Sequence, residues 1–142
     1  MRAGTENLYG IVGFAKALEL ATTNYEKDRA YISGLKQYMM AQLCEKVPGI
    51  EFNGDPEGRS LYTVLSVSFP KTEKSEMMLF NLDIHNICAS GGSACTSGAD
   101  QGSHVIRAIN NNPNQVTVRF SFSKHNTREQ VDTVINILNE IA

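Results

Sequence analysis

Residues 90–98 form a stretch rich in glycine and serine that contains a single thiol, Cys95. Its neighbours Ala94 and Thr96 are small, whereas a buried structural cysteine usually sits among large apolar side chains. Glycines let a backbone approach a ligand closely, and an exposed thiol near a cation or a helix N-terminus forms thiolate readily. The stretch therefore predicts a nucleophilic cysteine on a loop. Composition alone fits equally a plain Gly/Ser loop that contains a cysteine.

A second candidate, Arg119, lies in a segment with the two-residue period of a strand. The apolar side chains of this segment share one face: Val116, Val118, Phe120 and Phe122. Arg119 falls on the opposite face with Thr117 and Ser121. We therefore expect its guanidinium to point away from the core, where it either binds a ligand or forms a surface ion pair.

The elements that must position these residues follow from the rest of the pattern. Helical spacing over residues 8–18 and 32–43 predicts two long amphipathic helices, and Pro48-Gly49 ends the second. We further expect strands at 61–69 and 87–89, with Cys88 in the core, and helices at 75–82 and from about 103 to 107. A capping box at Thr127 opens a last helix to residue 141. The predicted fold class is α+β, a two-layer α/β sandwich with a small sheet of about three to four strands.

Composition excludes several classes of protein. The 142 residues, 42% of them hydrophobic, fit a single domain, 1–142, with a real core. A net charge of -2 argues against nucleic acid as the main partner. Three cysteines, an odd number, exclude a full disulfide framework and favour a reducing compartment. Because no membrane-length apolar run or signal peptide is visible, we expect a cytoplasmic chain with no membrane partner.

The cysteines and histidines suggest two other kinds of site, a zinc site and the active site of a cysteine hydrolase. A zinc site would draw on His85, Cys88, Cys95 and His104, but their spacings lack a C-x-x-C or H-x-x-x-H pair, so we expect no metal site. His104 more readily lines the loop or begins the helix after it. A cysteine hydrolase would need His104 or His125 to activate Cys95, and the sequence places neither histidine beside the thiol.

Three segments together resemble successive motifs of the cysteine desulfurases: residues 2–7 (RAGTEN), 89–97 (ASGGSACTS) and 118–122 (VRFSF). These enzymes are class V aminotransferases of pyridoxal phosphate (PLP) fold type I. The likeness covers essentially the whole chain but only the C-terminal small domain of the family, similar to that of aspartate-aminotransferase-like enzymes. The long Ser/Gly loop resembles the branch that serves iron–sulfur cluster assembly and nitrogen fixation.

The resemblance implies specific roles for three residues. Cys95 would be the nucleophile that takes sulfur from L-cysteine as a persulfide, which leaves L-alanine. Arg119 would bind the substrate carboxylate, for which a planar guanidinium is suited. Thr5 would contact the PLP phosphate of the other subunit in a homodimer, although by itself Thr5 reads as a helix N-cap. The implied acceptor of the sulfur is a protein such as an iron–sulfur scaffold.

The chain also departs from the family pattern. The lysine-bearing large domain that binds PLP does not precede Arg2, and Lys124, beyond the last strand, is not expected to replace that lysine. Thr63 and Ser66 stand where the family commonly carries asparagines. Because Met1 directly precedes a motif that normally lies inside a longer polypeptide, we expect an excised domain that neither holds PLP nor turns over cysteine alone. The alternative is a stand-alone persulfide-relay module without PLP.

Overall fold

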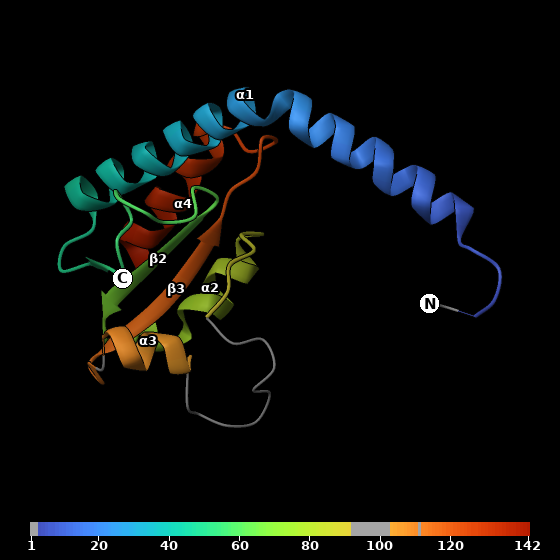
Figure 1. Ribbon diagram of the computed structural model, residues 1–142. Helices are drawn as coiled ribbons and strands as arrows, with labels where there is room; N and C mark the ends of the chain where they lie inside the picture. Colours follow the sequence, from blue (N-terminus) through green and yellow to red (C-terminus); the bar gives the residue numbers. More distant parts are fainter. Residues whose placement is uncertain (1–2, 92–102, 111) are drawn as a thin grey trace.

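A three-stranded antiparallel sheet carries the fold, with β2 (Val64–Pro70) between β1 (Glu51–Phe52) and β3 (Gln115–Ser121). The computed structural model describes residues 3–91, 103–110 and 112–142 (Figure 1). The helices α1 (Leu8–Lys46) and α4 (Arg128–Ile141) contact each other and share one core with the sheet. The shorter elements are η1 (Ser75–Met77), α2 (Met78–Ile84) and α3 (His104–Ile109). The expected α+β class with a small sheet is confirmed.

The register between β2 and β3 separates an apolar face from a polar face. Leu65 lies opposite Phe120, and Val67 lies opposite Val118. All four are buried against the helices. The alternate positions pair Ser66 with Arg119 and Ser68 with Thr117. The alternation that the sequence predicted for β3 is confirmed.

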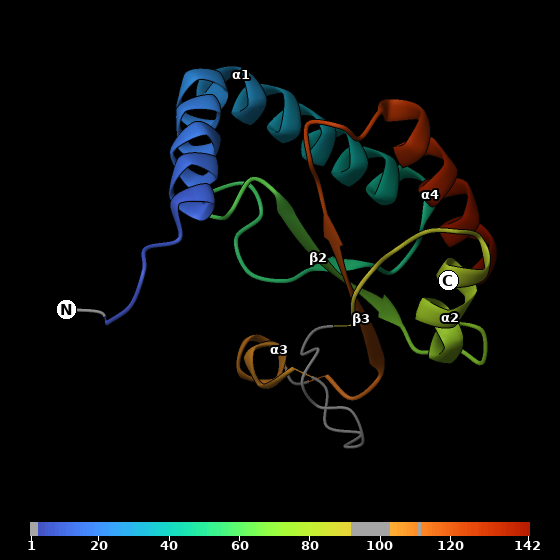
Figure 2. The ribbon, with the colours of Figure 1, turned by 90° about the vertical axis from the view of Figure 1, so that its right-hand side faces the viewer.

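One continuous helix replaces the two that periodicity predicted. α1 runs for 39 residues without interruption, because no proline or glycine stands between residues 14 and 33 to end it. Thr22 and Thr23 bond their hydroxyls to backbone carbonyls one turn earlier, a contact that often bends helices. Figure 2 shows α1 changing direction along its length.

The predicted strand at 87–89 is wrong, as is the burial of Cys88. A single isolated bridge, between Ser90 and Arg119, is formed there. Ile87 and Ala89 still pack against the core, but Cys88 is exposed. Strand β2 begins at Val64 rather than residue 61 because a turn precedes it, with the Val64 amide bonded to the Leu61 carbonyl at 3.2 Å. Strand β1 was missed because two residues are too few to show alternation.

Side-chain contacts hold α1 against α4. The Tyr38 hydroxyl donates to Asp132 Oδ1 at 2.6 Å, and this hydrogen bond raises the pKa of Tyr38. The Arg128 guanidinium lies 5.0 Å from the centre of the Tyr38 ring, a cation–π contact. At the start of α4, Thr127 and Gln130 form the predicted capping box. The two helices are therefore joined by polar contacts at the rim of their apolar interface.

The N-terminal half of α1 extends away from the sheet (Figures 1 and 2). The buried residues of α1 all belong to its other half, from Ile32 to Leu43. The free half carries an exposed apolar stripe: Leu8, Ile11, Val12 and Leu18. Although α1 is long, none of the helices in the described ranges is apolar enough to cross a membrane.

The core position Ile135 in α4 offers a test of the packing. Ile135 is fully buried, so Ile135→Ala removes buried methyl groups and leaves a cavity. We expect the free energy of unfolding to fall by about 2–5 kcal/mol, measured by urea denaturation. Asn136→Ala, at the exposed neighbouring position, should change it by less than about 0.5 kcal/mol. Equal losses for the two variants would contradict this packing.

The apolar stripe predicts that the isolated chain self-associates, since exposed contiguous apolar surface favours contact between copies. Light scattering after size exclusion should give a mass that rises with concentration. Ile11→Glu combined with Leu18→Glu should shift the chain toward monomer. Ala30→Glu, exposed on the packed half of α1, is the control and should leave self-association unchanged. A strictly monomeric wild-type chain at high concentration would show that the stripe does not drive association.

Candidate active site

Arg119 lies on the polar face of β3 with its side chain exposed. The alternation of Val118, Arg119 and Phe120 produces this orientation, because both apolar neighbours are buried on the other face. The Nη2 atom of Arg119 donates to Ser90 Oγ at 3.3 Å. A guanidinium has five N–H donors, so this contact orients the group and leaves donors for a ligand. The prediction that Arg119 points away from the core is confirmed.

The backbone of Ser90 is fastened to that of Arg119 by a pair of hydrogen bonds. The Ser90 amide donates to the Arg119 carbonyl at 3.1 Å, and the Arg119 amide donates to the Ser90 carbonyl at 2.7 Å. Gly91 follows against α2, where an added Cβ would come within 2.7 Å of Leu79 Cδ1. The chain therefore enters residues 92–102 directly beside Arg119.

After residues 92–102, the chain returns to the sheet at the end of α3. Helix α3 begins at His104, as one of the two expected roles of this histidine required. At its C-cap, Asn110 donates to Gln115 Oε1 at 2.8 Å and to Glu51 Oε2 at 3.2 Å. Gln115 starts β3 and Glu51 starts β1. The chain is thus bonded to the sheet that carries Arg119 both before residues 92–102 and after α3.

Cys95 lies outside the described residues, as does the rest of 92–102. Its role as nucleophile therefore stays a prediction, and so does any relation between Cys95 and His104 or His125. His125 is exposed after β3. Sequence reasoning missed Ser90 as a partner of Arg119. The residue was visible at the start of the Gly/Ser stretch, but no local pattern relates it to a strand 29 residues later.

A hydrogen-bonded row of polar side chains continues the polar face. Asn53 Nδ2 donates to Ser66 Oγ at 3.2 Å and to Ser68 Oγ at 2.8 Å. The hydroxyls of Ser68 and Thr117 are 3.0 Å apart. Since Ser66 is the cross-strand partner of Arg119, the row supports the strands on the face that Arg119 occupies.

Thr5 is exposed and precedes α1. The N-cap of α1 is Asn7, whose Oδ1 accepts from the Gly10 amide at 3.1 Å. The expectation that Thr5 serves as an N-cap is therefore wrong. In both overall views the first turns of α1, which Thr5 precedes, lie away from the sheet (Figures 1 and 2). The structure does not bring Thr5 and Arg119 together, and the assignment of Thr5 to a phosphate in another subunit stays a prediction.

The remaining candidates are surface residues. Lys124 pairs with Asp28, at 3.3 Å between Nζ and Oδ2, which agrees with its expected place on the surface. Cys44 is exposed near the end of α1. In the parts of the chain that the structure describes, no three side chains of His, Cys, Asp or Glu come together as a metal site would require.

The chain resembles known proteins along nearly its whole length. The family described as "Aminotransferase class-V" matches residues 1–134. A cysteine desulfurase of Sinorhizobium fredii is 41% identical over 139 residues, which cover 96% of this chain and 35% of the relative. Cysteine desulfurase NifS of Azotobacter vinelandii is 38% identical over 136 residues, covering 94% and 33%.

A solved structure shares the fold. The X-ray structure of a NifS-like protein from Rickettsia africae superposes with a TM-score of 0.78 at 27% identity, over 99% of this chain and 36% of that one. The chain therefore spans about 35% of the length of the first curated relatives it matches. Because the family match covers almost all of its residues, the chain belongs to the class V aminotransferases.

Proposed function

We propose that this chain is the C-terminal small domain of a PLP-dependent cysteine desulfurase. The enzyme converts L-cysteine to L-alanine and transfers the sulfur to Cys95 as a persulfide. Support comes from the similarity to cysteine desulfurases and from the surroundings of Arg119. A stand-alone relay module without PLP has no comparable support, since the similar proteins named here are desulfurases or NifS-like proteins.

The bridge between Ser90 and Arg119 is the observation that carries this proposal. Cys95 follows Ser90 by five residues, and five residues of extended chain span at most about 18 Å. The Cα atom of Cys95 therefore lies within about 18 Å of the Cα atom of Ser90. Ser90 is the residue that is bonded to Arg119. This tether supports a site in which Arg119 is the carboxylate ligand and Cys95 is the sulfur nucleophile.

The two residues act on opposite ends of the substrate. The exposed guanidinium of Arg119 binds the carboxylate of L-cysteine through charge-assisted hydrogen bonds. The Cys95 thiolate attacks the substrate sulfur, so that an S–S bond forms as the substrate C–S bond breaks. The electron pair of the broken C–S bond stays on the carbon, which takes up a proton, so that L-alanine leaves and Cys95 keeps the transferred sulfur as a persulfide. PLP, when bound, would supply the electron sink for this chemistry.

The described residues do not form a complete site for PLP, on which class V aminotransferases in general depend. A resident lysine is needed, and five of the described lysines contact residues other than Arg119: Lys16 with Glu19, Lys36 with Ser60, Lys71 with Glu76, Lys74 with Glu140 and Lys124 with Asp28. Thr5 offers only an exposed hydroxyl, which suits an outer contact to the cofactor phosphate of a second subunit. We therefore assign the cofactor's main ligands to a large domain and the working enzyme to a homodimer.

The sulfur acceptor and the location follow from the same proposal. A persulfide is passed on by attack of an acceptor thiol on its outer sulfur, so the partner is a thiol-bearing protein such as an iron–sulfur scaffold. We place this exchange in the cytoplasm, where thiols stay reduced.

The isolated chain provides the first test. Purified and supplied with PLP and L-cysteine, it should form neither alanine nor sulfide, because it lacks a lysine site for the cofactor. Amino-acid analysis and a sulfide assay measure the two products. Alanine production by the pure chain would contradict its assignment as one part of the enzyme.

A chimera provides the positive test. The segment of the Sinorhizobium fredii desulfurase that matches this chain is replaced by the chain itself. We expect the chimera to form alanine and, with a reductant, sulfide. Cys95→Ser should abolish sulfide release, while Cys44→Ser, at an exposed site on α1, should leave it unchanged. A folded, PLP-loaded chimera that makes no alanine would overturn the proposal.

Arg119→Gln in this chimera tests the substrate contact. Loss of a hydrogen bond to a charged group costs about 1.5–3 kcal/mol, or about 10–100-fold in kcat/KM. The loss should fall mainly on KM for L-cysteine, because the carboxylate is held before and after sulfur transfer. Arg59→Gln, exposed in another part of the chain, should keep the parent KM. An unchanged KM in Arg119→Gln would remove Arg119 from the substrate site.

A further inference from the structure

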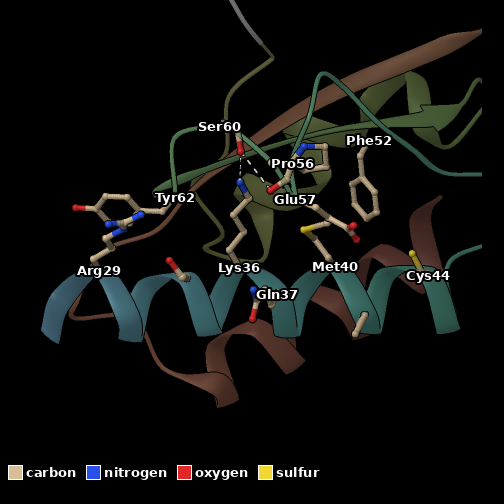
Figure 3. Close-up of a pocket in the computed structure, with 13 residues that line it drawn as sticks. Arg29, Lys36, Gln37, Met40, Cys44, Phe52, Pro56, Glu57, Ser60 and Tyr62 are labelled. Carbon is tan, nitrogen blue, oxygen red and sulfur yellow. Dashed lines mark hydrogen bonds between the residues drawn. The ribbon is translucent and has the colours of Figure 1, made fainter. Parts of the chain in front are cut away.

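A cavity of about 580 Å³ opens between the packed half of α1 and residues 52–62 (Figure 3). The residues on which its chemistry depends are Arg29, Lys36, Met40, Phe52, Glu57 and Tyr62. None of the residues assigned above to sulfur transfer lines it. Its volume lies in the range of sites that hold small organic molecules.

Lys36 is the unusual residue of this cavity, because only 4% of its surface is exposed. Its Nζ atom donates to Ser60 Oγ at 2.9 Å and to the Leu61 carbonyl at 3.3 Å. An ammonium group has three N–H donors, so one remains for another partner. Figure 3 shows the side chain rising from α1 toward Ser60. The buried amine is thus only partly satisfied by the chain.

The charge of Lys36 is also poorly compensated. Burial lowers the pKa of Lys36. The negative charge of Asp55 opposes this shift without cancelling it. Among the described residues, no carboxylate forms an ion pair with its Nζ atom. A buried cation gains most from a directly bound anion, because the anion restores the interaction lost with water.

The chemistry of the side chains that line the cavity changes along α1. Arg29, two turns before Lys36 on α1, extends toward Tyr62 at one end of the cavity (Figure 3). On the other side of Lys36 lie Met40, Phe52 and Glu57 (Figure 3). The positive end favours an anionic group, and the thioether and the ring favour an apolar body. The Glu57 carboxylate disfavours a second negative charge at that far end.

We propose that this cavity binds a small organic monocarboxylate with an apolar or aromatic body. The carboxylate accepts the free N–H of Lys36 and lies in the positive field of Arg29, while the apolar part packs against Met40 and Phe52. The site is separate from the sulfur-transfer residues and does not depend on the proposed desulfurase activity.

Benzoate is a suitable probe, with benzamide as its uncharged analogue of nearly equal shape. The 142-residue chain is titrated with each at constant ionic strength, and binding is followed by amide shifts in NMR spectra. We expect saturable benzoate binding that shifts amides of residues 29–44 and 52–62. Benzamide should bind at least about tenfold more weakly, a difference of about 1.4 kcal/mol.

Substitutions locate the site. Lys36→Met keeps an unbranched side chain in the buried position and should weaken benzoate binding at least about tenfold. Lys46→Met, exposed at the last turn of α1, is the control and should bind as the parent does. Arg29→Gln, at an exposed position, should weaken binding several-fold and serves if Lys36→Met does not fold. The proposal would be overturned if benzoate binding did not saturate, if benzamide bound equally well, or if a folded Lys36→Met chain bound benzoate as the parent does. If Lys36→Met does not fold, parent-like binding by Arg29→Gln would overturn it.

Discussion

The antiparallel register of β2 and β3 is the constraint on which both faces of the sheet depend. Opposite residues share a face, so the pairing of Leu65 with Phe120 also places Ser66 opposite Arg119. A shift of one residue would turn every side chain of one strand to the other face. It would bury the Arg119 charge in the core and expose Val118 and Phe120, two side chains of the buried core. The same apolar burial that stabilises the sheet therefore holds Arg119 in solvent.

The polar face becomes a candidate active site through contacts between residues that lie far apart in the chain. Ser90 is bonded to Arg119 through backbone and side chain, and Asn110 returns the chain to Gln115 and Glu51. The chain is thus bonded to one sheet at Ser90, before residues 92–102, and at Asn110, after α3. In the proposed enzyme, these contacts would anchor the chain that carries the Cys95 thiol beside the carboxylate ligand Arg119.

α1 contributes two different environments to the molecule. Its packed half buries apolar residues and also Lys36, whose amine opens on a cavity beside residues 52–62. Its other half presents apolar side chains to solvent, while the relatives extend well beyond the matched region. The difference between the halves is one of partners rather than of local helix structure, since both belong to one uninterrupted helix.

The sequence by itself determined the features that arise from local backbone geometry. These include the outward face of Arg119 and the capping box at Thr127, because strand alternation and helix caps depend on neighbouring residues. It also marked Cys95 as a candidate by composition. Only the tertiary structure decided the Ser90–Arg119 bridge, the continuity of α1, the exposure of Cys88 and the burial of Lys36. Each of these depends on which distant segments pack together, and no local period records that.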